Sequence, residues 1–123
     1  MDLEAWNQSF LEHTTVIAEA NGTVLGFGDM DNTGYLDSLY IHRDFQNKGV
    51  ATAILAALEQ KALLAEIGHF VTYASITAKP FFESRGYFVI EENIAIRSGI
   101  QLLNYRMEKT CTPHPYNPFI NQP

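Results

Sequence analysis

The residues best suited to chemistry form a short polar turn, residues 46–51, with the sequence QNKGVA. It lies between a predicted strand, residues 35–42, and a predicted helix that runs to about residue 67. The first N–H groups of a helix have no partner within the helix, and the helix dipole favours negative charge there. Gly49 lets a ligand approach the backbone closely, and Lys48 adds positive charge. The turn therefore predicts an anion site of the pyrophosphate kind.

The turn matches neither of the two common phosphate-binding motifs. The chain contains no GxxxxGK[ST] sequence and no GxGxxG sequence, so a nucleoside triphosphate or a dinucleotide is only weakly indicated. On local sequence alone, an ordinary polar turn between a strand and a helix explains these six residues at least as well.

A second segment, residues 74–87 with the sequence ASITAKPFFESRGY, follows at a suitable distance. Together the two segments resemble the GNAT superfamily of acetyl-CoA-dependent N-acyltransferases. The phosphate loop of that family reads Gln/Arg-x-x-Gly-x-Gly/Ala, which Gln46, Gly49 and Ala51 match. Its later signature has an Ala, two bulky apolar residues, and a Gly before an aromatic residue, as in Ala78, Phe81, Phe82, Gly86 and Tyr87. The resemblance covers about residues 14–109.

The periodicity of the chain predicts an element order of βββαβαββ after one short helix. That helix is expected to begin at Asp2, with Leu3, Trp6 and Phe10 on one face. The remaining elements are expected at residues 14–20, 23–30, 35–42, 50–67, 69–74, 87–97 and 100–108, with a second helix that begins at residue 77 or 79 and ends at residue 86. The Asn21–Gly22 pair is a strong signal for the first hairpin turn.

The resemblance implies an α/β (α+β) fold of the GNAT type, with a mixed, mostly antiparallel sheet flanked by helices. Members of the family usually begin with an additional strand and helix, which are missing here. We therefore expect residues 14–20 to form an uncovered edge of the sheet, which is prone to pairing. A second copy of the chain, its own tail or an upstream polypeptide is expected to cover that edge, and a homodimer is our prediction.

Composition limits the classes of function. The 123 residues make one domain, residues 1–109, followed by a Pro-rich tail, residues 110–123. The net charge of −6 argues against a nucleic-acid binder and is compatible with a cationic amine substrate. The single cysteine, Cys111, allows no internal disulfide, which suits a cytoplasmic protein. The chain shows no signal peptide, no run near ~18 apolar residues and no spacing of metal ligands.

The family resemblance also implies how the cofactor, acetyl-CoA or another acyl-CoA, is held. Backbone N–H groups of residues 46–52 would face its pyrophosphate, and backbone groups of the preceding strand would bind its pantetheine arm. One of those strand amides would also point at the thioester carbonyl. The cofactor-binding residues implied in this way are Leu39, Ile41, Gln46, Asn47, Lys48, Gly49, Val50, Ala51, Thr52, Ser75, Pro80, Phe81 and Phe82.

The acid and the base are less directly indicated. Many members of the family have, where Phe82 stands, a tyrosine that protonates the departing thiolate, and Phe82 has no proton to give. Tyr73 and Tyr105 are the substitutes, although each is also typical of an amphipathic tyrosine at the edge of a core. Asp37 matches the usual place of the base, and strand alternation predicts that it shares a face with Leu39.

Two functions of different classes remain open at this point. The first is an N-acetyltransferase that acts on an amine of a small molecule or a protein. The second is a truncated module that binds acyl-CoA or a partner without catalysis. Phe82 and the missing N-terminal elements favour the second, and the phosphate loop is compatible with both.

Overall fold

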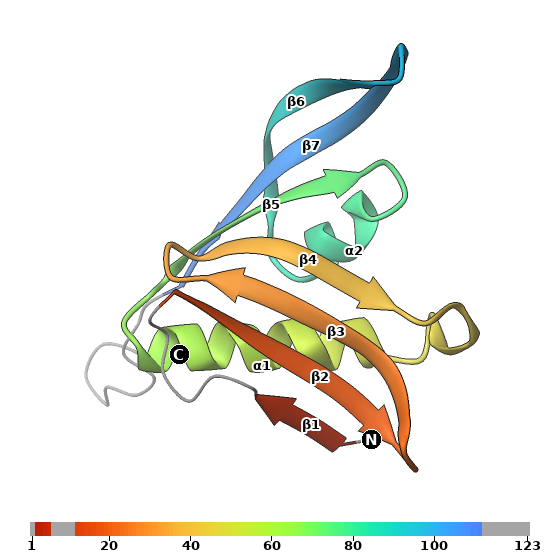
Figure 1. Ribbon diagram of the computed structural model, residues 1–123. Coiled ribbons are helices and arrows are strands. Elements are labelled where there is room, and N and C mark those ends of the chain that lie inside the picture. Colours follow the sequence, from red (N-terminus) through yellow and green to blue (C-terminus); the bar gives the residue numbers. More distant parts are fainter. Residues whose placement is uncertain (1, 6–11, 112–123) are drawn as a thin grey trace.

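A computed structural model of the chain describes residues 2–5 and 12–111 (Figure 1). These residues form one seven-stranded sheet with the strand order β1-β2-β3-β4-β5-β7-β6. All neighbouring strands are antiparallel except β4 and β5, which are parallel. The elements are β1 (Asp2–Ala5), β2 (His13–Ala20), β3 (Thr23–Asp31), β4 (Tyr35–Ile41), the 3-10 turn η1 (Arg43–Phe45), α1 (Val50–Leu64), β5 (His69–Ser75), α2 (Lys79–Ser84), β6 (Phe88–Arg97) and β7 (Ile100–Thr110). The predicted mixed sheet and the order of elements from β2 onward are confirmed.

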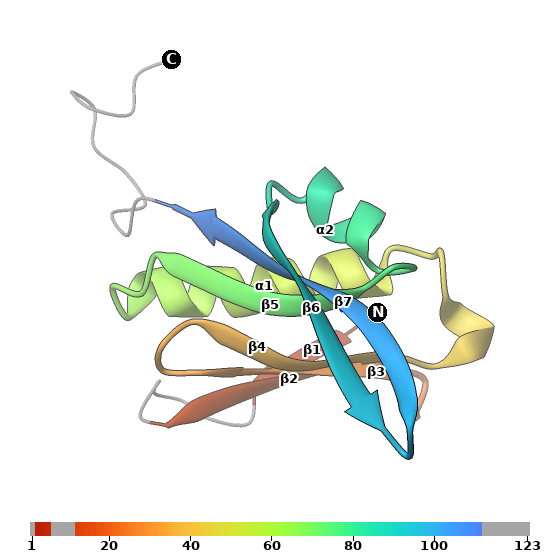
Figure 2. The same cartoon turned by 90° about the horizontal axis from the view of Figure 1, so that it is seen from above.

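The two helices lie on one face of the sheet (Figure 2). Helix α1 connects β4 to β5, and α2 connects β5 to β6; in both cases the two strands run in the same direction. Both crossovers move along the sheet in the same sense, so two right-handed connections place both helices on the same face. The apolar face of α1 packs against β2, β3 and β4. Gly28 makes this approach close, because a Cβ atom there would lie 2.8 Å from the side chain of Ile54. The N-terminus of α1 is thereby held against the sheet beside the end of β4.

The N-terminal segment differs from our expectation. Residues 2–5 form a strand rather than a helix, and they pair with β2 from Asp2 opposite Glu19 to Ala5 opposite Val16. The helix prediction is wrong there because a local capping signal is outweighed by backbone hydrogen bonds to a neighbouring strand. Trp6 and Phe10 lie outside the described residues.

The pairing of β1 also corrects the prediction of an open sheet edge at residues 14–20. Residues 16–19 have β1 on one side and β3 on the other, so their backbone groups are not left as an exposed ladder. A short strand occupies the edge position that we expected to be empty, and the argument for a dimer at that edge loses its basis. The predicted Pro-rich tail lies almost entirely outside the described residues.

Neither helix in the part of the chain that the structure describes is long and apolar enough to cross a membrane. The cytoplasmic location expected from the sequence stays a prediction.

Candidate cofactor and acceptor site

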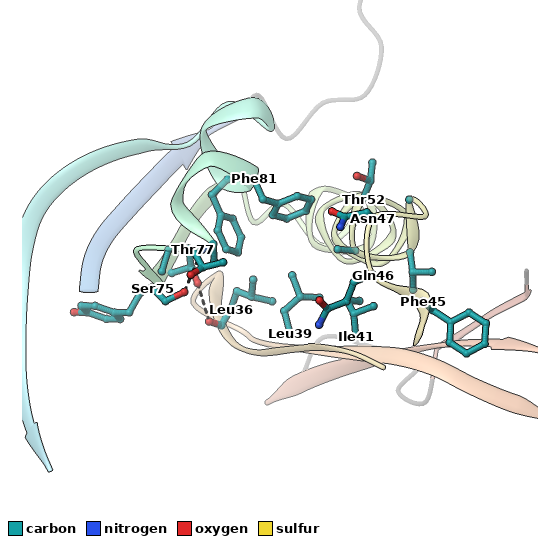
Figure 3. Close-up of a pocket in the computed structure, with 18 of the residues that line it drawn as sticks. Leu36, Leu39, Ile41, Phe45, Gln46, Asn47, Thr52, Ser75, Thr77 and Phe81 are labelled. Carbon is teal, nitrogen blue, oxygen red and sulfur yellow. Dashed lines mark hydrogen bonds between the residues drawn. The ribbon is translucent and has the colours of Figure 1, made fainter. Parts of the chain in front are cut away.

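A cleft of about 810 Å³ opens between β4, β5, the start of α1 and α2 (Figure 3). In the close-up, Leu39 and Ile41 from β4 lie on one side of the cleft and Phe81 from α2 lies on the other. Every cofactor-binding residue predicted from the sequence lines this cleft except Lys48 and Pro80. Two segments that are far apart in the sequence, residues 46–52 and residues 74–82, thus meet at one hollow.

The cleft exists because β4 and β5 separate after a short contact. Their pairing is limited to Tyr35 opposite Val71 and Leu36 opposite Thr72. The Thr72 hydroxyl donates a 3.4 Å hydrogen bond to the Leu36 carbonyl at this point. Beyond it, the side of β4 that faces β5 has no strand paired with it among the described residues. The two strands therefore diverge after this contact, which leaves backbone groups of Leu39 and Ile41 along the slot.

A β-bulge in β4 gives Asp37 a special position. Asp29 pairs with Ser38 and Met30 pairs with Leu36, so Asp37 is the extra residue between them. The bulge interrupts the alternation of side chains, and the argument that placed Asp37 on the face of Leu39 by alternation is wrong. Asp37 nevertheless lines the cleft and is exposed, so its carboxylate is available to a ligand.

The loop before α1 has the backbone geometry of an anion site. Asn47 and Gly49 have positive φ angles of 62° and 79°, and Gly49 is the N-cap of α1. The backbone bond from the Ala53 N–H to the Gly49 carbonyl, at 3.1 Å, is the first of the helix. The N–H groups of residues 50–52 come before it and have no helical carbonyl to bind. The first turn contains no acidic residue, so nothing there opposes an anion.

The opposite wall is built by α2. The Ala78 N–H donates a 3.1 Å hydrogen bond to the Ser75 hydroxyl oxygen, which fixes the turn that leads into the helix. Phe82 is buried, and its ring makes edge-to-face contacts with Phe81 at 5.1 Å and with Tyr87 at 5.3 Å between centroids. Phe81 and Phe82 make this wall apolar, which suits the alkyl part of a ligand.

A polar group behind this wall was not predicted from the sequence. The Tyr87 hydroxyl donates a 2.7 Å hydrogen bond to one Glu59 carboxylate oxygen, and the Lys109 ammonium donates one of 2.8 Å to the other. Burial raises the pKa of the Tyr87 hydroxyl, and the hydrogen bond and negative charge of Glu59 raise it further. The signal was present in the sequence, because Glu59 stands on the apolar face of α1, between Leu55 and Ala62 at helical spacing.

The two candidate tyrosines are placed differently. Tyr73 lines the cleft, and 45% of its surface is exposed. Tyr105 is not among the lining residues, and the Lys79 ammonium lies 5.4 Å from the centre of its ring. The geometry therefore brings Asp37 and Tyr73 to the same cleft and leaves Tyr105 outside it.

Tyr35 is a further neighbour of this site that the sequence did not suggest. Its ring meets the Tyr73 ring edge-on, with 6.0 Å between centroids. Burial raises the pKa of the Tyr35 hydroxyl, and the charge of Asp37 adds to that shift. Among the residues that the structure describes, no cluster of His, Cys, Asp or Glu could hold a metal ion.

Known proteins resemble this chain over most of its length. A family model for the acetyltransferase (GNAT) domain matches residues 1–109. The uncharacterized N-acetyltransferase YafP of Escherichia coli (strain K12) is 28% identical over 107 residues, which cover 87% of this chain and 67% of that protein.

Solved structures show the same fold. A GCN5-related N-acetyltransferase from Rhodopseudomonas palustris, also described as a class-II aminotransferase, superposes with a TM-score of 0.75 and 31% identity, over 80% of this chain. The paia N-acetyltransferase from Thermoplasma acidophilum, solved in complex with coenzyme A, superposes with a TM-score of 0.69 and 20% identity, over 82% of this chain. The chain spans 62% of the length of each of these two proteins.

Proposed function

Because the chain belongs to the GNAT acetyltransferase family, we propose that it transfers an acetyl group from acetyl-CoA to an amine of a small molecule or a protein. The observation that carries this proposal is the cleft itself. It joins a helix N-terminus suited to an anion, a strand whose slot-side backbone groups have no partner strand among the described residues, an apolar wall and a carboxylate in one continuous hollow. A module that only binds a partner does not require this combination, and the name of the curated relative does not favour such a module.

The residues of the cleft fit the chemical parts of acetyl-CoA. Backbone N–H groups of residues 50–52 are suited to the pyrophosphate. Gly49 leaves open space beside them, because a Cβ atom added there would meet no atom within 4 Å beyond its chain neighbours. The backbone of Leu39 and Ile41 can bind the amide groups of the pantetheine arm as an added strand does. When bound, acetyl-CoA supplies an acetyl group activated as a thioester.

Asp37 is the residue that we assign to proton removal. An aliphatic ammonium has a pKa of about 10, so the acceptor must lose a proton before its nitrogen can attack. A carboxylate in direct contact would favour the charged ammonium, and therefore we propose that Asp37 takes the proton through a water molecule. Its place in the bulge, exposed and facing the cleft, allows a water to lie between the two groups.

Tyr73 is the residue that we assign to proton donation. Its hydroxyl would hold the proton that the departing sulfur needs, a role for which Phe82 has no suitable group. Tyr105 is the weaker candidate, because it does not line the cleft. Tyr35 supports the orientation of the Tyr73 ring through their edge-on contact.

Two measurements test this function in sequence. Calorimetry with acetyl-CoA should show binding, and release of free thiol over a panel of amines should then identify at least one acceptor. Absence of binding at millimolar acetyl-CoA would refute the proposal at its first step. Binding without thiol release for any small amine, peptide or protein N-terminus would instead favour the non-catalytic module.

A further inference from the structure

The hairpin of β6 and β7 carries an unusual amount of exposed apolar surface. The pairing of β5 with β7 ends at Ser75 opposite Asn104, so residues 94–103 extend as a two-stranded arm beyond the rest of the sheet (Figure 1). Large apolar side chains on this arm are exposed, with Ile94 at 60%, Ile96 at 69%, Ile100 at 62% and Leu102 at 47% of their surface. Exposed apolar side chains concentrated on one element in this way point to an interaction site.

The apolar side chains of the arm lie on both of its faces. Ile94 pairs with Leu103, and their side of the hairpin is the side of Met107, which faces the helices. Ile100 and Leu102 alternate with these positions and point to the opposite face. An arm that is apolar on both faces is not explained by packing against its own sheet, whose last contact is at Asn104.

β6 is also the last strand of the sheet. Its outer backbone groups have no partner strand among the residues that the structure describes. The stretch at the centre of the arm, residues 93–96, has the sequence NIAI and carries no charge or proline. Natural edge strands that stay unpaired usually carry charged residues or prolines. In β6 the charged residues, Glu91, Glu92 and Arg97, flank this stretch, so the uncharged middle of the strand has the properties of an edge that is paired in solution.

We propose that the partner is a second copy of this chain, which pairs its β6 with β6 of the first copy in an antiparallel, two-fold arrangement centred on Ile94. A two-fold axis perpendicular to the sheet keeps each residue on its own face, so the sheets of the two copies continue into each other. Ile94 then lies opposite the partner's Ile94, and each side chain shields part of the other from water. The same strand, β6, forms the contact in both copies.

Charge complementarity selects this register. Glu91 and Arg97 lie three residues to either side of Ile94 and share one face, so Glu91 lies opposite the partner's Arg97, and the reverse pair forms by symmetry. Arg97 has no ion pair with the described part of its own chain. Glu91 has one long ion pair, with 3.9 Å between its carboxylate and the Arg106 guanidinium, so it can still pair with a partner's arginine. Centring the axis on Asn93 or Ala95 would place Glu91 opposite Ala95 or Gly99, without a charged partner.

This interface is separate from the proposed catalytic site. No residue of β6 or β7 lines the cleft, so pairing of the arms leaves the slot open. The interface also differs from the edge at residues 14–20, which β1 already covers. Dimerisation and acetyl-CoA binding are therefore expected to be measurable independently.

Light scattering coupled to gel filtration, at tens of micromolar of the full chain, tests the proposal. We expect twice the 13.8 kDa mass of the chain. Ile94→Arg places two like charges at the axis and should give the monomer mass, with unchanged far-ultraviolet circular dichroism and unchanged acetyl-CoA affinity. Leu64→Arg is the matched control, because Leu64 is 69% exposed on α1, and it should leave the dimer intact.

A charge series tests the register and does not depend on the folding of Ile94→Arg. Arg97→Glu places an acidic side chain opposite the partner's Glu91 twice per dimer and should raise the dissociation constant by about tenfold or more. Glu91→Lys combined with Arg97→Glu should restore most of the affinity. A wild-type mass of 13.8 kDa, or a dimer that persists in Ile94→Arg, would overturn the proposed interface. A charge series without effect would overturn its register.

Discussion

The Tyr87 hydroxyl donates a hydrogen bond of 2.7 Å to the Glu59 carboxylate, and this bond ties the middle of α1 to the segment that enters β6. Tyr87 is only 2% exposed, and its ring packs edge-to-face on Phe82, which lines the cleft. The Lys109 ammonium compensates the charge of the same carboxylate. A buried polar link therefore holds the apolar wall of the site from behind, and its partners come from three distant parts of the chain.

Removing the hydroxyl of Tyr87 should cost stability. Tyr87→Phe keeps the ring on Phe82 but leaves the Glu59 carboxylate with one donor fewer in a buried position, and we expect a loss of about 1–3 kcal/mol in the free energy of unfolding. Urea titration followed by circular dichroism measures it. Tyr40→Phe, at an exposed position of β4, is the control and should change stability little. Equal stability of both variants would show that the bond contributes nothing.

The same bond predicts a dependence on alkaline pH. The pKa of Tyr87 is raised in the folded protein, so above the ordinary tyrosine pKa of about 10 the unfolded chain releases a proton that the folded chain retains. Stability from this group is full below that pH and is lost as the pH rises above it. The free energy of unfolding should thus fall between about pH 10 and 11, and the fall should be shallower in Tyr87→Phe than in wild type. An identical slope in both proteins would contradict the assignment.

The phosphate loop gives the sharpest test of ligand binding. Gly49→Asp would place a carboxylate beside the proposed pyrophosphate position, and we expect acetyl-CoA affinity to fall by about tenfold or more. Gly22→Asp is a matched control, because Gly22 also has a φ angle of 79° and open space around it, but it lies in the turn between β2 and β3. Both variants carry the same backbone strain, so calorimetry isolates the effect of the site. Equal affinity in the two variants would remove the loop from the binding site.

Local signals in the sequence predicted the parts of the fold that local geometry determines. The Asn21–Gly22 turn lies between β2 and β3, and the apolar spacing after Gly49 marks α1 to within three residues of its end. The turn at residues 46–51 was recognisable as the start of this helix for the same reason, because a glycine before an apolar helix is a short-range pattern.

The sequence did not predict features that arise only when distant segments meet. The pairing of Asp2–Ala5 with β2 depends on a partner more than ten residues away, and four residues are too few to show a strand pattern. The bulge at Asp37 leaves no trace in composition, although it decides where that carboxylate lies. The bond between Glu59 and Tyr87 joins residues 28 apart, and the bond between Glu59 and Lys109 joins residues 50 apart.

Asp37 can be tested by separating turnover from binding. If its carboxylate relays the proton of the acceptor amine, Asp37→Asn should lower kcat on the order of 100-fold and leave acetyl-CoA affinity nearly unchanged. Asp37→Glu keeps a carboxylate in the exposed bulge and should retain a larger share of kcat than the amide does. Steady-state kinetics by thiol release, with calorimetry for affinity, gives both quantities. Wild-type turnover in Asp37→Asn would clear the residue of this role.

Tyr73, which lines the cleft, and Tyr105, which does not, can be compared as candidates for the acid. Tyr73→Phe removes the hydroxyl of a residue that lines the cleft and should lower kcat, whereas Tyr105→Phe changes a residue outside the lining and should have little effect. A lower kcat in Tyr105→Phe with full activity in Tyr73→Phe would reverse the assignment. Full activity in both would mean that water protonates the departing sulfur, and the cleft would then act by binding and orientation, with Asp37 as its remaining proton-transfer group.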